Sequence, residues 1–225
     1  MSCHFKKDGQ NPIHLFANAY CFVLLMNHSI ELACRVFKAN KGILRTKEAL
    51  KAGIHRRTFY AMRQAGLIVC ISRGFYRLAN LPPLQNPDLA TVAKRIPQGV
   101  VCLVSALSFH GLTTQIPHEI SIAIPRSAWF PHLDYPPLKI HRFDKASLKS
   151  GVETHAIDGI DVRVYSPEKT LADCFKFRNK IGMPVFLEAL RTYRHRNKPN
   201  FDKVLEYARI CRVERLIKPH LETIL

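Results

Sequence analysis

Apolar residues at helical spacing mark the first predicted element of the chain, a helix capped by Ser29. Its apolar positions recur every three or four residues: Ile30, Ala33, Cys34 and Phe37. The Asn40-Lys41-Gly42 turn ends this pattern, because Gly accepts the left-handed backbone that closes many helices. We therefore expect a support helix before residue 40.

Two shorter helices and a hairpin are predicted to follow. Thr46 is placed to cap a second helix that runs through Ala52, and Gly53 supplies a tight turn after it. A third helix fits residues 55–65, with Gly66 at the position where a left-handed residue is needed. The apolar run 67–71, a Ser-Arg-Gly turn and residues 75–78 then form two strands of a wing.

The third predicted helix has one apolar and one basic face. Phe59 and Met62 fall on the side that should pack inward with Ile54. The opposite side carries Arg56, Arg57, Tyr60, Arg63 and Gln64. Guanidinium groups can bond guanine edges in a major groove, so this division is typical of a recognition helix. The alternative is a basic helix that is merely solvated.

The chain is predicted to be α+β with two domains. The Leu81-Pro82-Pro83-Leu84 string disrupts both helix and strand, which places a linker at residues 81–86 between a winged helix-turn-helix at 28–80 and a second domain at 87–225. The second domain should contain a small, mostly antiparallel sheet and a helical C-terminal half. Its predicted strands are 119–124, 138–143, 152–157 and 160–165, and its predicted helices are 87–96, 105–110, 166–179, 184–195, 201–210 and 212–224.

Positive charge is concentrated rather than spread. The chain has 34 Lys and Arg against 17 Asp and Glu, and residues 35–77 alone hold eleven Lys or Arg and one acid, Glu48. Such a patch attracts polyanions, because phosphate neutralisation releases counterions. Nucleic acid is the expected partner. The second domain carries a further basic patch near its C-terminus, which could add phosphate contacts or meet an acidic protein: Arg191, Arg194, Arg196, Arg209, Arg212 and Arg215.

The cysteines and the N-terminus bear on the compartment. Seven Cys without a CxxC pair indicate free thiols in a reducing cytoplasm, and neither Cys nor His shows the spacing of a metal site. We expect no metal and no cofactor. Lys6, Lys7 and the apolar run 15–26 imitate a signal peptide, but the run is too short to span a bilayer and no small-x-small cleavage site follows. Residues 1–27 are interpreted as an extension, either disordered or outside the native reading frame.

Enzyme motifs are not found in the sequence. No acid precedes a Lys at the spacing of a PD-(D/E)xK nuclease, and a P-loop, GxSxG and GxGxxG are lacking. Ser105 or Ser108 could pair with His110 in a hydrolase, but a His on a short helix more often bonds a neighbour. Likewise, Ser166-Pro167-Glu168 is typical of a helix start. We therefore expect a protein that is not an enzyme.

Seven strings resemble, in order, the AbiEi antitoxins of bacterial type IV toxin–antitoxin systems. They are GILRTKEALKAGI, RGFYRL, SALSFHGL, ISIAIPR, SPEKTLADCF, FLEALR and YAR…RLIKPHLETIL, and the likeness extends over about residues 28–225. The resemblance implies a winged helix that binds inverted repeats in its own promoter and represses it. It also implies a second domain that counters an AbiEii-type, nucleotidyltransferase-like toxin, not necessarily through a stable complex.

The candidate DNA contacts follow from the basic segment and from the resemblance together. They are Arg45, Thr46, Lys47, His55, Arg56, Arg57, Thr58, Tyr60, Arg63, Arg73 and Arg77. Two other functions stay open: a stand-alone regulator whose second domain senses a ligand or partner, and a nucleic-acid-processing enzyme with a dispersed site. No membrane partner is expected.

Overall fold

The computed structural model describes residues 28–82, 84–130, 133, 135–157 and 159–224. The chain divides into two compact units, Met1–Pro83 and Leu84–Leu225. This division falls inside the linker predicted at 81–86. The predicted N-terminal extension lies outside the described residues.

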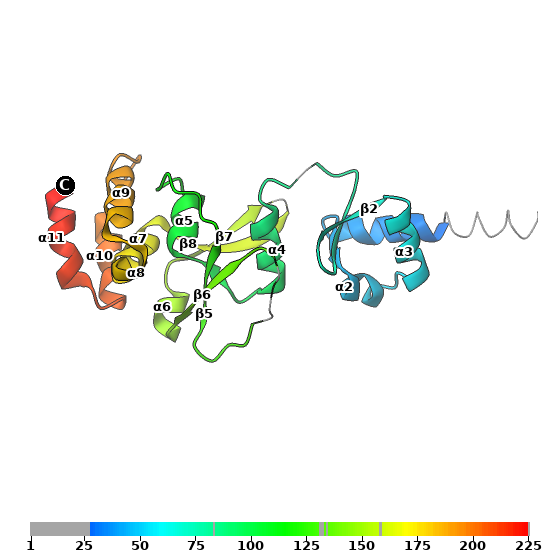
Figure 1. The fold of residues 1–225 in the computed structure, drawn as a ribbon, viewed down its shortest axis with the longest axis horizontal. Coiled ribbons are helices and arrows are strands. Elements are labelled where there is room, and N and C mark those ends of the chain that lie inside the picture. Colours follow the sequence, from blue (N-terminus) through cyan, green and yellow to red (C-terminus); the bar gives the residue numbers. More distant parts are fainter. Residues whose placement is uncertain (1–27, 83, 131–132, 134, 158, 225) are drawn as a thin grey trace, which may run out of the picture. The chain divides into compact units, whose positions relative to one another are not determined.

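The first unit is a winged helix-turn-helix (Figure 1). A helix over residues 28–39 precedes a short strand, two helices and a hairpin. The elements after it are β1 (Ile43–Arg45), α2 (Thr46–Lys51), α3 (Arg56–Gln64), β2 (Ile68–Ser72) and β3 (Phe75–Leu78). The strands form an antiparallel sheet in the order β1-β3-β2, so β3 is central. Strand β1 was not predicted, because three residues are too few to show an alternating pattern.

Apolar side chains from every element of this unit meet in one core. Phe37 of the first helix and Phe59 and Met62 of α3 are buried, together with Leu44 and Ile68. The predicted inward face of α3 is thus confirmed. Each large apolar side chain that is fully buried contributes about 1.5–3 kcal/mol of transfer free energy, and this burial holds the helices on the sheet.

The turns predicted at glycines are confirmed, and two helix starts differ by one residue. Gly53 and Gly66 have φ of +90° and +68°, which side chains other than Gly rarely adopt. Helix α2 is capped by Arg45 rather than Thr46, since the Arg45 N–H donates to Oε2 of Glu48 at 2.9 Å. His55 is the cap of α3 rather than its first residue.

The second unit is α+β, as expected. Its strands are β4 (Val100–Val101), β5 (Ile120–Pro125), β6 (Leu138–Phe143), β7 (Val152–Ile157) and β8 (Ile160–Tyr165). Its helices are α4 (Pro87–Arg95), α5 (Leu103–Phe109), α6 (Lys145–Lys149), α7 (Pro167–Lys176), α8 (Arg178–Ile181), α9 (Met183–Arg194), α10 (Phe201–Ile210) and α11 (Glu214–Ile224). The last five helices form the C-terminal half (Figure 1).

The five-stranded sheet is mixed, and in this detail it differs from the mostly antiparallel sheet that we expected. Its order is β6-β5-β4-β8-β7, with β4–β5 and β7–β8 antiparallel but β5–β6 and β4–β8 parallel. The reason is the length of the connection: β5 ends at Pro125 and β6 begins at Leu138, and a separation of this length allows the parallel pairing that a tight hairpin excludes. The short β4, absent from the prediction, joins the two halves through Val101, opposite Ile122 and Val164.

Each face of this sheet is covered by a different set of helices. On one face, Val92 of α4 and Ile96, the residue that follows the helix, pack with Ile122 and Ile124 of β5. On the other, Tyr165 joins the core formed with the C-terminal helices. The predicted start of α7 is confirmed: Ser166 is the cap, its Oγ accepts the Lys169 N–H at 3.3 Å, and Pro167 is the first helical residue.

Candidate nucleic-acid interface

Helix α3 presents a continuous exposed basic face. Arg56, Arg57, Tyr60 and Arg63 are exposed, while Phe59 between them is 1% exposed. No acidic residue lies in the first turn of α3. The exposed face therefore combines four guanidinium or phenol groups with the positive end of a helix dipole, which favours an anionic ligand.

His55 positions the start of α3. Its Nδ1 accepts the Arg57 N–H at 3.2 Å, so the imidazole satisfies one of the N–H groups that a helix start leaves unbonded. The side chain remains exposed. His55 thus caps the helix and lies beside Arg56 at the edge of the basic face.

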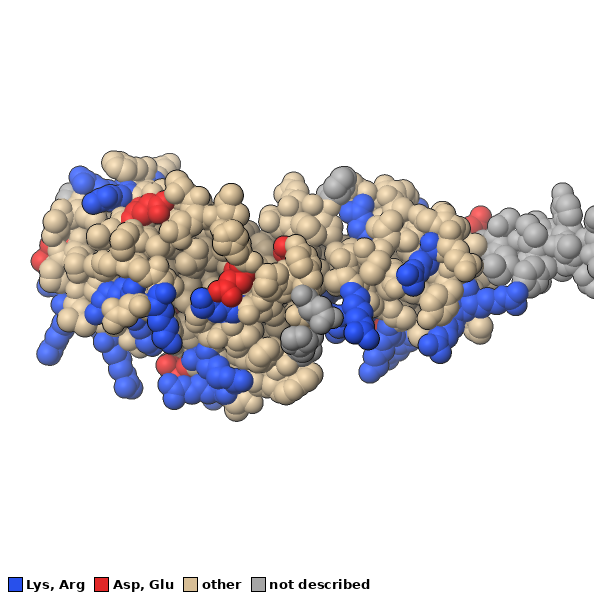
Figure 2. Space-filling model, viewed as in Figure 1, with Lys and Arg blue, Asp and Glu red and all other residues tan. Residues whose placement is uncertain are grey.

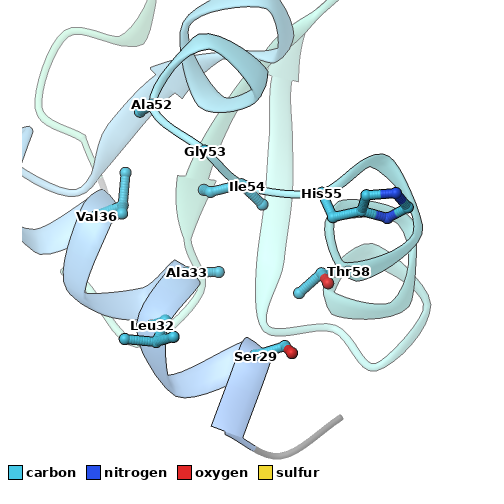
Figure 3. Close-up of a pocket in the computed structure, with 9 residues that line it drawn as sticks. All are labelled: Ser29, Leu32, Ala33, Val36, Ala52, Gly53, Ile54, His55 and Thr58. Atoms are coloured by element: carbon cyan, nitrogen blue, oxygen red, sulfur yellow. The ribbon is translucent and has the colours of Figure 1, made fainter. Parts of the chain in front are cut away.

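Thr58 was expected to contact DNA, and its burial contradicts this. The side chain is 7% exposed and lines a pocket of about 300 Å³ between the first helix and the turn after α2. Figure 3 shows Thr58 turned toward Ser29 and Ala33, whereas the His55 ring points away from them. The physical reason is the helical period: Thr58 precedes Phe59 on the side of α3 that faces the first helix.

The wing is tied to the start of α2. Its turn contains Arg73 and Gly74, and Gly74 has φ of +72°. The Thr46 N–H donates to the Gly74 carbonyl at 3.0 Å, and the Thr46 hydroxyl donates to the same oxygen at 3.5 Å. Thr46, half-buried, therefore positions the wing. Arg73 is exposed next to this anchor.

Arg77 was also expected to contact DNA, and the structure assigns it another role. It is 9% exposed, and its guanidinium donates to the carbonyls of Pro82 at 2.8 Å and Leu81 at 2.5 Å. All four residues of the central strand β3 are buried, because one side meets the core and residues 81–82 cover Arg77. We therefore remove Arg77 from the candidate DNA contacts.

The remaining candidates differ in exposure. Lys47 is exposed near the start of α2, and Arg45 is half-buried with its Nε 4.0 Å from Oε1 of Glu48. Figure 2 shows Lys and Arg side chains gathered on the visible face of the first unit, where few acidic side chains appear. The candidates that the structure leaves exposed are Lys47, His55, Arg56, Arg57, Tyr60, Arg63 and Arg73.

The six arginines of the basic patch predicted near the C-terminus are all exposed but not equally available. The Arg209 guanidinium donates twice to the Glu214 carboxylate, at 2.7 and 3.0 Å. That contact lowers the pKa of Glu214. Arg196 donates to the carbonyl of His110. The patch therefore contains two guanidinium groups that already bind protein oxygens, and its role stays a prediction.

Two of the side chains considered for catalysis, Ser105 and His110, are bonded to backbone. Ser105 Oγ donates to the Glu119 carbonyl at 3.3 Å and accepts the Ser121 N–H at 2.9 Å. His110 Nε2 donates to the Tyr165 carbonyl at 2.7 Å, and burial lowers the pKa of His110. Both side chains therefore join secondary-structure elements, which agrees with the structural interpretation.

A buried ionic cluster lies under α7, and the sequence analysis missed it. Lys169 Nζ donates to Oδ1 of Asp173 at 2.5 Å and to Ser147 Oγ at 3.3 Å, and it lies 4.6 Å from the centre of the Tyr165 ring. Cys211 Sγ donates to the same Asp173 oxygen at 3.2 Å. The available signal was the four-residue spacing of Lys169 and Asp173, which puts them on one helix face.

The described cysteines are free, as predicted, but they are not uniformly buried. Cys102, Cys174 and Cys211 are buried, Cys34 is half-buried and Cys70 is exposed. Within the described ranges, no group of His, Cys, Asp and Glu is arranged to hold a metal ion, and none of the helices could span a membrane.

Three comparisons place this geometry among known proteins. Residues 35–79 match the family model described as "Transcriptional regulator, AbiEi antitoxin", which confirms the resemblance across the helix-turn-helix and wing. A search of curated proteins finds no match. Among solved structures, the chain is similar to the crystal structure of the RV2827C protein from Mycobacterium tuberculosis, with 12% identity over 85% of this chain and 79% of that chain and a TM-score of 0.49.

Proposed function

We propose, from the match of residues 35–79 to the AbiEi antitoxin transcriptional regulators, that this chain is a cytoplasmic DNA-binding antitoxin. Its winged helix binds inverted repeats in the duplex promoter of its own operon and represses transcription. Its second unit counters a nucleotidyltransferase-like toxin of the AbiEii type, with or without a stable complex between the two proteins.

The exposed basic face of α3 carries the DNA-binding part of this proposal. Arg56, Arg57, Tyr60 and Arg63 are exposed on the surface opposite the buried Phe59 and Met62. An α-helix fits the major groove of B-form DNA, and guanidinium groups bond guanine there in a bidentate manner. Arg73, exposed on the wing, is assigned to contacts with backbone phosphates.

A binding assay with a matched control tests this assignment. Titration of the promoter duplex is followed for the wild type, for Arg56→Glu/Arg57→Glu and for Arg35→Glu/Lys38→Glu, which makes the same charge change on exposed positions of the first helix. The α3 variant should lose about tenfold or more in affinity, since each base-reading Arg is worth about 1–3 kcal/mol. Its salt dependence should become shallower as phosphate contacts are lost.

The control variant shows whether DNA binding depends on α3 itself or on the overall positive charge of the first unit. The Arg35→Glu/Lys38→Glu protein should keep most of the discrimination between the promoter and a scrambled duplex. Equal losses in both variants, with the same salt dependence, would show that overall charge rather than α3 governs binding.

The antitoxin part is tested separately by co-expression with the neighbouring toxin. The full chain carrying Arg56→Glu/Arg57→Glu should still rescue growth when it is expressed from an unrelated promoter, because neutralisation is assigned to the second unit. Loss of rescue together with loss of DNA binding would tie the two activities to the same surface.

One observation favours a second candidate, a regulator whose second unit senses a small ligand. A pocket of about 380 Å³ in that unit is lined by polar and apolar side chains, among them Asp88, Ser105, Ser108 and Phe109. This volume lies in the range of ligand pockets. A metabolic operon around the gene would support the regulator, and an adjacent toxin gene would support the antitoxin.

A further inference from the structure

Trp129 is the one tryptophan of the chain, and it lies almost fully in solvent. Its exposed fraction is 79%, although indole is among the side chains that bury most area on folding. Single apolar side chains are common on protein surfaces, so the surroundings of the indole, not its exposure alone, must indicate a binding site. The question is what holds it there and what it can bind.

Backbone contacts fix the segment that presents Trp129. The Ala128 N–H donates to the Pro125 carbonyl at 3.1 Å at the end of β5, and Arg142 of β6 donates to the carbonyls of Arg126 at 2.5 Å and Ala128 at 3.1 Å. Gln98 donates to the Trp129 carbonyl at 3.4 Å. The loop is thus attached to β5, to β6 and to the turn after α4.

The residues on either side of Trp129 point inward. Ala128 and Phe130 both pack against the cluster formed by Val92 and Ile96 under α4. Because its neighbours are anchored in that cluster, the indole between them is directed outward. Its exposure is therefore built into the packing of the loop.

Trp129 forms one wall of a pocket that also contains a guanidinium group. The pocket has a volume of about 470 Å³ and is lined by Arg95, Ile96, Pro97, Gln98 and Trp129. Arg95 ends α4 and is half-buried, and Arg163 of β8 donates to the Gln98 carbonyl at 3.2 Å, which braces the pocket wall. The volume is within the range of about 300–1,000 Å³ that is usual for ligand pockets.

We propose that this pocket binds an unpaired nucleotide of a single-stranded nucleic acid, with the base stacked on Trp129 and the phosphate near Arg95. Aromatic rings stack with any base, and guanidinium groups bond phosphate oxygens, which is the combination that single-strand-binding surfaces use. Charge favours this ligand over an apolar peptide, because the described lining of the pocket contains the Arg95 guanidinium and no acidic side chain. The site is separate from the duplex-binding face proposed on α3.

The single tryptophan makes the test direct. Trp129 emission is recorded while the full chain is titrated with a single-stranded ten-nucleotide oligo(dA), the same length of oligo(rA), AMP, or a duplex of mixed sequence. Stacking should quench the emission with the single strands. Quenching by AMP alone at comparable concentration would identify a free nucleotide as the ligand, and equal quenching by the duplex would overturn the single-strand assignment.

Affinity measurements on variants supply the second readout, with a dye-labelled oligonucleotide. Trp129→Leu keeps an exposed apolar side chain but removes the ring, and it should weaken single-strand binding by about fivefold to a hundredfold. Trp129→Phe should weaken it less. Arg56→Glu/Arg57→Glu should leave the Trp129 quenching unchanged, which separates this site from the winged helix.

Two results would overturn the proposal. One is Trp129 emission that does not change when the labelled strand is fully bound. The other is Trp129→Leu binding the strand as tightly as the wild type. Either result would show that bases do not stack on Trp129.

Discussion

The Nζ of Lys169 lies 2.5 Å from Oδ1 of Asp173, and neither side chain has any exposed surface. The two residues are one helical turn apart on α7, and Cys211 and Ser147 complete the hydrogen bonds from other elements. A buried ion pair costs much desolvation, so its value depends on both partners being present. This relationship gives the sharpest stability prediction for the second unit.

Asp173→Asn should destabilise the second unit by about 3–5 kcal/mol, because it leaves the Lys169 ammonium uncompensated in an apolar site. Urea unfolding followed by far-ultraviolet circular dichroism measures the change. The matched control is Glu222→Gln, which breaks another Lys–acid pair at the same spacing but with both side chains more than half exposed. That control should change stability by no more than about 0.5 kcal/mol.

The paired replacement Lys169→Met/Asp173→Leu tests whether the loss of stability comes from the unpaired buried charge. It removes both charges, so it should cost less than Asp173→Asn alone. A double variant that is less stable than the single would contradict the view that the unpaired charge is the main penalty.

Arg77→Met should destabilise the first unit by about 2–3 kcal/mol, since the carbonyls of Leu81 and Pro82 lose a charged donor. The salt dependence of DNA binding should not change in the folded protein, because the guanidinium is buried. Arg73→Met is the comparison: it should leave stability within about 0.5 kcal/mol and reduce the salt slope by about 0.9 if Arg73 binds a phosphate. The reverse pattern would restore Arg77 as a DNA contact.

Gly53→Val should destabilise the helix-turn-helix by more than about 1–2 kcal/mol, because its φ of +90° is unfavourable for a β-branched residue. Gly53→Asn should cost less, since Asn tolerates a left-handed backbone better. A Cβ at this position would meet no atom within 4 Å, so a steric clash cannot account for the difference. Thermal unfolding of both variants measures it, and equal losses would be inconsistent with a backbone origin.

The second unit should lose stability as the pH falls below about 6.5 through the titration of His110. Burial lowers the pKa of His110 below its ordinary value of 6.5, so the unfolded chain takes up the proton first and acid favours unfolding. His110→Gln keeps an N–H donor for the Tyr165 carbonyl but does not titrate. Its stability should fall less steeply between pH 7 and pH 5, and parallel curves for the two proteins would exclude His110 as the source.

Several elements could be predicted because their signals are local. The strands at 138–143, 152–157 and 160–165 were predicted with the bounds that the structure shows, since each is a short run with β-branched residues and at least partial alternation of apolar and polar positions. The turns at Gly53 and Gly66 and the cap at Ser166 also depend on neighbouring residues alone. Strands β1 and β4 were missed because segments of two or three residues show no periodic pattern. They become strands only through pairing with neighbouring strands: β3 for β1, and β5 and β8 for β4.

Exposure was harder to predict than secondary structure. Thr58 and Arg77 carry polar side chains in a basic segment, which favoured a DNA-facing role, yet the first helix covers Thr58 and residues 81–82 cover Arg77. The residues that cover Thr58 belong to the first helix, far away in the sequence. Those that cover Arg77 belong to an irregular segment. Periodicity within one element does not report such neighbours.

By itself, the sequence determined the order of the longer helices and strands, the concentrated positive charge of residues 35–77 and the inward face of α3, because caps, turns and periodicity act over a few residues. Only the tertiary structure decided which polar groups stay in contact with solvent. It placed Lys169 against Asp173 without exposure, bonded Arg77 to the linker and directed Trp129 outward. Burial depends on contacts between distant segments, and those contacts exist only once the chain has folded.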